Sequence, residues 1–189
     1  MLVIWPFRLL KIGPVPCGAG RFLLEDRMAQ FHGKRVSHEY TQANVAPPEK
    51  VFPLLCPVRE AEWVPGWQHR LIFSQSGVAE AGCVFVTPNE DGSETTWAVT
   101  EYDPAALLIA FVWVNPGGVA AQIRIRLERN LSGDTTAHIR YTYTGLSPQG
   151  NVEVERYDEK WFRNKMESWE SAINHYLRTG KLIGATAWE

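Results

Sequence analysis

The stretch that decides the fold reads VAAQIRIRLERNLSGDTTAHIRYTYTGL and runs from residue 119 to residue 146. Apolar and polar residues alternate on both sides of Ser132-Gly-Asp134, which is a turn signal. Ile123, Ile125 and Leu127 share one face of the first half, and charged residues occupy the opposite face. The stretch therefore predicts two antiparallel strands with one buried face and one wet face.

Shorter β-like runs precede this hairpin. Turn signals rich in Gly, Pro, Asn and Asp divide residues 69–146 into consecutive segments, which is typical of an antiparallel meander. One more strand comes earlier, followed by two short helical segments that prolines delimit. The predicted strands are 36–42, 69–75, 83–87, 95–102, 107–114, 119–130 and 135–146, and the predicted short helices are 47–56 and 59–63.

A long amphipathic helix is predicted from about residue 155 to residue 179. Its apolar residues recur at spacings of four and three, which places them on one stripe, and Gly180 can end it in the left-handed conformation. At 1.5 Å per residue the helix would be roughly 35 Å long, enough to cover a whole curved sheet. The stripe comprises Phe162, Met166, Trp169, Ile173, Tyr176 and Leu177.

Composition excludes several classes of protein. The 189 residues are 45% hydrophobic and 21% charged, as in ordinary soluble globular proteins. A net charge of −2 without a Lys/Arg cluster argues against nucleic-acid binding. Cys17, Cys56 and Cys83 lie far apart and form no CxxC pair, which fits a reducing cytosol better than a disulfide framework. This cysteine pattern leads us to expect a cytoplasmic protein. No apolar run reaches the ~18 residues that a membrane span needs.

The N-terminal segment lies outside the predicted domain. It has the apolar character of a short signal segment, but Pro6, Arg8 and Lys11 interrupt it and no positive region precedes it. Alternatively, translation begins at Met28. The oligomeric state stays open. We divide the chain into an N-terminal extension (1–35), one ligand-binding domain (36–182) and a C-terminal tail (183–189).

Three sequence segments carry a resemblance to a known superfamily. The segment APPEKVFPLLCPVREAEWVPGW at 46–67 resembles the two-helix insert after the first strand of START-like (SRPBCC) proteins. Its ending, together with EYDP at 101–104 and NHYLRTG at 174–180, is similar to the polyketide cyclase/dehydrase-like branch. The resemblance covers about residues 36–182. It implies an α+β helix-grip fold, in which a curved antiparallel sheet of about seven strands surrounds the long C-terminal helix.

That resemblance also implies a deep cavity between sheet and helix. Such cavities hold lipids, polyketides or other apolar compounds, and no cofactor is expected. The chain contains eight Trp, eight Phe and six Tyr, and large rings are suited to the walls of apolar pockets. The expected lining is Trp63, Trp67, Trp97, Val99, Phe111, Trp113, Ile123, Ile125, Tyr141, Tyr143, Phe162, Met166, Trp169 and Ile173.

No motif assigns a reaction. The sequence has no GxSxG, GxGxxG or P-loop, and its five histidines show no metal-ligand spacing, so no metal is expected. The candidates for catalysis are His69, Glu101, Tyr141 and Tyr143, each of which faces the predicted cavity by strand parity. Each also has a structural interpretation: a hydrogen-bonded core histidine, a wet carboxylate at a strand end, and plain aromatic packing.

The cavity mouth is predicted near Arg59, Glu60 and Glu62. These charges either orient the polar head of a ligand or lie on a solvated helix face, and the second reading is favoured.

Three function classes remain. The first is a protein that binds an apolar small molecule, and the second is a polyketide cyclase/dehydratase-type enzyme that moves a proton with a polar cavity residue. The third is a co-chaperone-like interaction module that uses the wet sheet face, where Arg124, Arg126, His138 and Arg140 lie. Sequence alone does not decide whether the protein is an enzyme.

Overall fold

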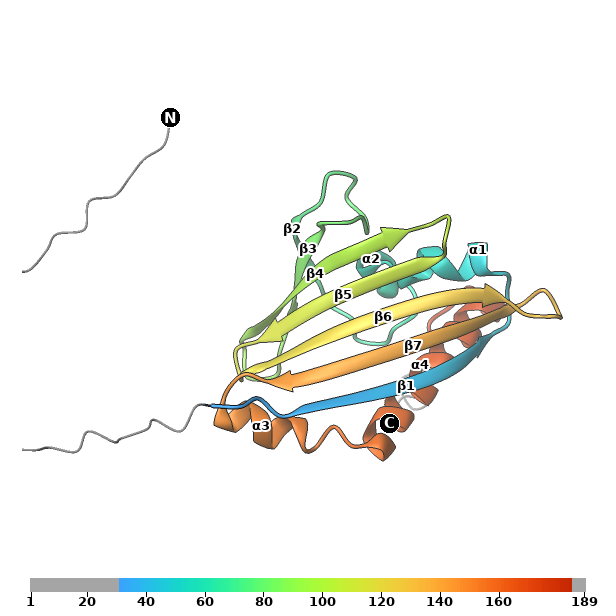
Figure 1. Ribbon diagram of the computed structural model, residues 1–189. Coiled ribbons are helices and arrows are strands. Elements are labelled where there is room, and N and C mark those ends of the chain that lie inside the picture. The colour runs from blue at the N-terminus through green and yellow to red at the C-terminus, as the bar shows by residue number, and fades with distance from the viewer. Residues whose placement is uncertain (1–30, 185–189) are drawn as a thin grey trace, which may run out of the picture. The chain divides into compact units, whose positions relative to one another are not determined.

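The computed structural model describes residues 31–184. They form a seven-stranded antiparallel sheet with helices against one face (Figure 1). The expectations for Met28 and the N-terminal extension lie outside these residues, and the division into domains stays a prediction.

The sheet order is β1-β7-β6-β5-β4-β3-β2. The strands are β1 (Arg35–Asn44), β2 (Arg70–Phe73), β3 (Val84–Pro88), β4 (Glu94–Asp103), β5 (Leu108–Asn115), β6 (Val119–Arg129) and β7 (Thr135–Gly145). The helices are α1 (Pro48–Val51), the 3-10 helix η1 (Phe52–Leu55), α2 (Pro57–Glu60), α3 (Pro148–Val154) and α4 (Glu159–Thr179).

The predicted hairpin is confirmed as β6 and β7. Ile123 pairs with Tyr141 across the two strands, and Ile125 pairs with Ile139. Burial alternates along both strands because successive side chains point to opposite faces. Gly133 has a φ of 88° in the connecting turn, a conformation that favours glycine.

Strand β4 contains a β-bulge at Thr100. Val99 lies opposite Phe111, whereas Glu101 lies opposite Ala110, so Thr100 is an extra residue without a partner on β5. The extra residue reverses the alternation. Val99 is therefore buried, while Glu101 turns to the outer face, and the expectation that both share one face is wrong.

The two short helical segments differ from the prediction at Pro57. The preceding segment ends at Leu55, before Pro57 as predicted, because Cys56 before the proline is extended. The second helix begins two residues earlier than predicted, at Pro57 itself, since proline is tolerated in a first helical turn. Trp63 and Trp67 follow α2, and their indole N–H groups donate to the carbonyl oxygens of Leu54 (2.9 Å) and Pro57 (2.7 Å). The two tryptophans thus attach the connection to the short helices.

The long C-terminal helix begins four residues later than predicted. The Asp158 side chain accepts a hydrogen bond from the Trp161 N–H (2.7 Å), and this cap starts α4 at Glu159. The helix ends before Gly180, which has a φ of 66°, as predicted. A separate helix, α3, comes before the cap.

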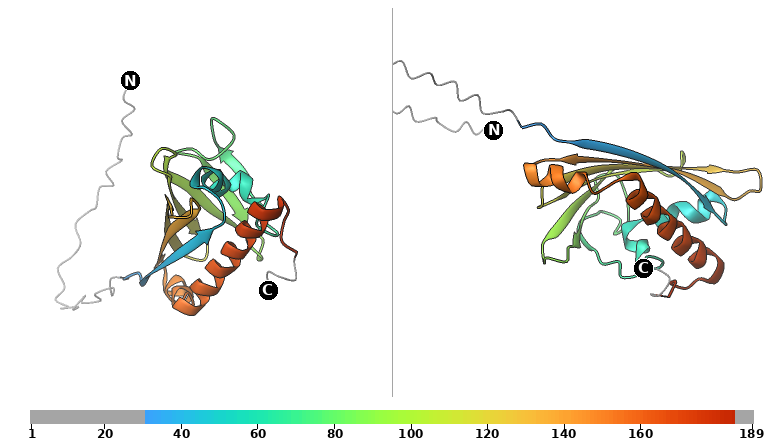
Figure 2. Two further views of the ribbon diagram at one scale, coloured as in Figure 1. Left: turned by 90° about the vertical axis from the view of Figure 1, so that its right-hand side faces the viewer. Right: turned by 90° about the horizontal axis from the view of Figure 1, so that it is seen from below.

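Helix α4 lies across the concave face of the sheet (Figure 2). The Tyr40 hydroxyl donates to the Glu170 carboxylate (2.7 Å), and the Asn174 amide donates to the Ala43 carbonyl oxygen (2.7 Å). These bonds join α4 to β1. Phe162 and Ile173, which belong to the apolar stripe of α4, are buried. Within residues 31–184, no helix is both long and apolar enough to cross a membrane.

Candidate ligand-binding site

Two adjoining hollows lie between the sheet and α4. The inner hollow has a volume of about 20 Å³, which is room for about one water molecule. The outer hollow measures about 320 Å³ and is bounded by residues 64–68, the end of β3 and α4. Trp67, Trp97, Tyr141 and Trp169 line both hollows. We call the two together the grip pocket.

Aromatic rings fill most of the space behind the grip pocket. The Trp97 ring stacks on Phe85, with centroids 5.5 Å apart, and also contacts Trp113 at 5.8 Å. Phe111 and Trp67 each lie 6.5 Å from Trp97, with their rings edge-on. The expectation of a deep cavity is therefore wrong for this structure. The available space is a shallow pocket above an aromatic core.

The residues expected to line a cavity divide into two groups. One group lines the inner hollow, and the other packs around it in the core. Phe85 also lines the hollow and was missed, because strand β3 is too short for its parity to be read from the sequence. The lining group is Trp67, Trp97, Phe111, Ile123, Ile125, Tyr141 and Trp169, and the core group is Trp63, Val99, Trp113, Tyr143, Phe162, Met166 and Ile173.

The Glu60 side chain is buried in the wall of the inner hollow. It is 7% exposed, and no side chain or backbone group of residues 31–184 donates a hydrogen bond to its carboxylate. Its neighbours differ: Arg59 donates to Glu62 (2.9 Å), and Glu62 also accepts from the Tyr176 hydroxyl. The expectation that Glu60 lies on a solvated helix face is therefore wrong. Burial raises the pKa of Glu60 to about 8, and Lys165 opposes part of this rise.

The turn of α2 explains this burial. Pro57 and Glu60 are three residues apart, so they share the inward side of the short helix. A carboxylate at this place looks like an ordinary exposed helical residue in the sequence, and no local signal marks it.

Lys165 of α4 lines the outer hollow. Its ammonium nitrogen lies 5.2 Å from the centroid of the Trp161 ring and 5.4 Å from that of Tyr141. Among the described residues, no carboxylate lies within ion-pair distance of it. Burial lowers the pKa of Lys165 to about 8, and Glu60 opposes part of this fall. The sequence did contain a signal, since Lys165 follows Phe162 by three residues and so falls on the apolar stripe.

Tyr141 connects the two charged groups. The side chain is 3% exposed, and it lines the inner hollow with Glu60 and the outer hollow with Lys165. Burial raises the pKa of its hydroxyl far above the ordinary value, so the group stays protonated and able to donate. We call Glu60, Tyr141 and Lys165 the polar trio.

Solved structures with this architecture identify the fold. Norcoclaurine synthase from Thalictrum flavum aligns with a TM-score of 0.59 over 88% of this chain and 99% of that chain, at 13% sequence identity. The chain has the START-like helix-grip fold. Ara h 8.0201 gives a TM-score of 0.54 over 77% and 99% of the two chains, at 14% identity. DynU16, from the dynemicin biosynthetic locus, gives 0.51 over 77% of this chain and 48% of that chain, at 20% identity.

The comparisons by sequence found no match. No family model matches this chain, and no curated protein does so either. The expected superfamily fold is confirmed, while the finer likeness to the polyketide cyclase/dehydrase-like branch stays a prediction.

Of the four catalytic candidates, only Tyr141 lies in the grip pocket. His69 is half-buried just before β2 and lines neither hollow. Glu101 forms an ion pair with Arg124 on the outer face. Tyr143 is buried against Tyr141 and Tyr157 in the core, with ring centroids 5.7 and 4.7 Å away.

Residues 31–184 offer no cluster of three or more His, Cys, Asp or Glu side chains that could hold a metal ion. Cys56 and Cys83 are buried free thiols.

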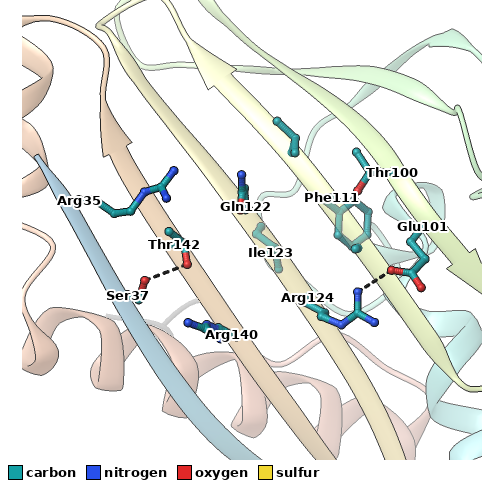
Figure 3. Close-up of a pocket in the computed structure, with 12 residues that line it drawn as sticks. Arg35, Ser37, Thr100, Glu101, Phe111, Gln122, Ile123, Arg124, Arg140 and Thr142 are labelled. Atoms are coloured by element: carbon teal, nitrogen blue, oxygen red, sulfur yellow. Dashed lines mark hydrogen bonds and ion pairs between the residues drawn. The ribbon is translucent and has the colours of Figure 1, made fainter. Parts of the chain in front are cut away.

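The outer face of the sheet carries a different, open hollow of about 750 Å³ (Figure 3). Its charges are largely compensated, because Arg124 pairs with Glu101, and Arg140 lies 3.7 Å from Glu39. Beside it, the Glu128 carboxylate lies near two further basic side chains of the face, Arg126 (3.6 Å) and His138 (3.4 Å).

Proposed function

We propose that this protein binds a compact apolar small molecule in the grip pocket. The observation that carries the proposal is the pocket itself, in which Trp67, Trp97 and Trp169 surround an opening whose floor holds unpartnered polar groups. Aromatic walls with a few polar groups are typical of small-molecule sites. A norcoclaurine synthase structure of the same fold holds dopamine and hydroxybenzaldehyde, which are compact aromatic compounds.

The size of the pocket supports a small ligand over a long lipid chain. The outer hollow, at about 320 Å³, lies at the lower end of the range of drug-sized sites. Extending a ligand inward would require the Trp97 ring to leave its stack on Phe85. We therefore favour a molecule with one or two rings. A cytoplasmic location is part of the proposal, since the buried thiols of Cys56 and Cys83 are free.

Native mass spectrometry of the full chain, purified from its own host, tests this function. We expect a bound small-molecule mass that organic extraction removes. A matched pair of variants locates it: Gln68→Trp fills the mouth of the grip pocket, whereas Gln122→Trp adds the same ring on the outer face. The first should lose the ligand and the second should keep it. The proposal fails if the ligand is lost from Gln122→Trp alone, or if no removable mass is found.

A second candidate function is catalysis of the polyketide cyclase/dehydratase type. The polar trio favours it, because burial raises the pKa of the Glu60 carboxyl group and lowers that of the Lys165 amine, which suits both groups to giving and taking a proton. The co-chaperone-like alternative has less support, since the charges on the outer face are largely paired with each other.

A further inference from the structure

One acidic and one basic side chain face the grip pocket without meeting. Glu60 comes from α2 and Lys165 from α4, and neither forms an ion pair with any described residue. A buried charge without a partner is costly, and a direct ion pair would reduce that cost. Glu60 lines the inner hollow, Lys165 lines the outer one, and Tyr141 lines both. A ligand in the outer hollow can therefore contact both groups if it directs one small polar atom into the inner hollow, which has room for about one water molecule.

The surroundings of Lys165 favour a reactive amine. The contacts of the nitrogen with the ring faces of Tyr141 and Trp161 favour the ammonium ion, whereas the loss of water around the nitrogen favours the uncharged amine. With its pKa lowered to about 8 by burial, about one Lys165 side chain in ten is uncharged at pH 7. An exposed lysine with an ordinary pKa is uncharged in only about one molecule in several thousand. The uncharged amine is the form that attacks carbonyl carbon.

We propose that Lys165 condenses with the carbonyl group of an aromatic aldehyde or ketone in the grip pocket to form an imine, with Glu60 supplying the proton. The inference rests on the proposed function, because the carbonyl compound must first occupy the same pocket. Aromatic walls suit the ring of such a compound, and the Tyr141 hydroxyl can donate a hydrogen bond to its carbonyl oxygen.

The step balances without an oxidant or a reductant. The Lys165 nitrogen bonds to the carbonyl carbon, and the carbonyl π bond breaks as its oxygen takes a proton from the Glu60 carboxyl group. One proton of the nitrogen returns to Glu60. The carbon–oxygen bond then breaks, and the hydroxyl leaves as water with that proton. A protonated C=N bond remains beside the Glu60 carboxylate, so one carbonyl compound enters and one water leaves.

Reductive trapping tests the proposal. The full-length protein is treated with benzaldehyde and sodium cyanoborohydride at pH 7, and peptide mass mapping measures the benzylation rate of each lysine. Lys165 should react at least ~10-fold faster than Lys160, an exposed lysine of the same helix, because a far larger fraction of its amine is uncharged. Its rate should level off above about pH 8, whereas that of Lys160 should keep rising.

A matched pair of variants tests the role of Glu60. Glu60→Gln removes the proton donor and should slow benzylation at Lys165 several-fold while leaving Lys160 unchanged. Glu62→Gln alters the neighbouring carboxylate, which pairs with Arg59 and does not line the grip pocket, and it should leave the rate at Lys165 unchanged. Equal effects of the two substitutions would contradict the assignment of Glu60.

Benzyl alcohol separates this inference from the proposed function. It carries the same ring without a carbonyl group, and its binding is measured by quenching of tryptophan fluorescence. Both proposals are supported if benzyl alcohol binds saturably and, when added to the trapping reaction, slows the benzylation of Lys165. Binding with equal rates at Lys165 and Lys160 overturns the imine and leaves the binding function standing. Equal rates with no binding contradict both.

Discussion

The two faces of the sheet differ in whether their ionisable side chains have ion-pair partners. On the outer face, charged side chains are exposed and meet partners across the strands, as Arg124 meets Glu101. On the inner face, Glu60 and Lys165 border the grip pocket without a partner among the described residues. Exposed pairs contribute little to stability, whereas unpaired buried charges reduce it. Glu60 and Lys165 therefore do not serve the stability of the fold. The reason that we propose for them is ligand chemistry.

The largest difference between the faces should come from their apolar contacts. Phe85 is 1% exposed and stacks on Trp97, so Phe85→Ala should lower the free energy of unfolding by about 3–4 kcal/mol. Gln122→Ala on the outer face should change it by less than about 0.5 kcal/mol. Urea denaturation measures both. Similar losses for the two substitutions would show that the aromatic cluster is not the core of the fold.

An intermediate effect of opposite sign is expected for Glu60→Gln. The pKa of Glu60 in the folded state, about 8, lies above its ordinary value of 4.5, so between these values the folded protein holds a proton that the unfolded chain releases. Wild-type stability from this group is therefore complete below pH 4.5 and is lost as the pH rises to about 8. Glu60→Gln should be more stable by about 1–3 kcal/mol at pH 8, with little gain at pH 4.5.

Denaturation curves at the two pH values check this prediction, and Glu62→Gln serves as the control. Glu62 has a lowered pKa, because Arg59 and Tyr176 donate hydrogen bonds to it, so its loss should destabilise the protein at pH 8. A Glu60→Gln protein that is less stable than the wild type at pH 8 would mean that the Glu60 carboxylate has a partner in solution.

The smallest effect should come from the outer ion pairs. Both Glu101 and Arg124 have side chains about half exposed, so Glu101→Gln should cost less than about 0.5 kcal/mol. Salt should reduce this difference further, since exposed pairs are screened. Thermal unfolding at low and high salt measures it. A loss as large as that of Phe85→Ala would remove the contrast between the faces.

Sequence predicts the strands of this protein well, because one face of the sheet is buried and the alternation along β6 and β7 records it. It does not predict the bulge at Thr100, which depends on pairing with β5 and leaves no mark on composition. The spacing of apolar residues predicts the stripe of α4, but it does not show that Lys165, which lies on the same stripe, borders a pocket. Glu60 could not be predicted, since its burial depends on how α2 packs against the sheet.

The pairing of β1 with β7 has a consequence for synthesis of the chain. Arg35 pairs with Thr144, so the first strand of the sheet is made long before its partner. At usual ribosomal rates of about 5–20 residues per second, this delay is roughly 5–20 s. Strands β2 to β7 can pair with their neighbours as they emerge, but β1 must wait. The polar trio spans residues 60–165, so the ligand site is completed only when the final helix docks.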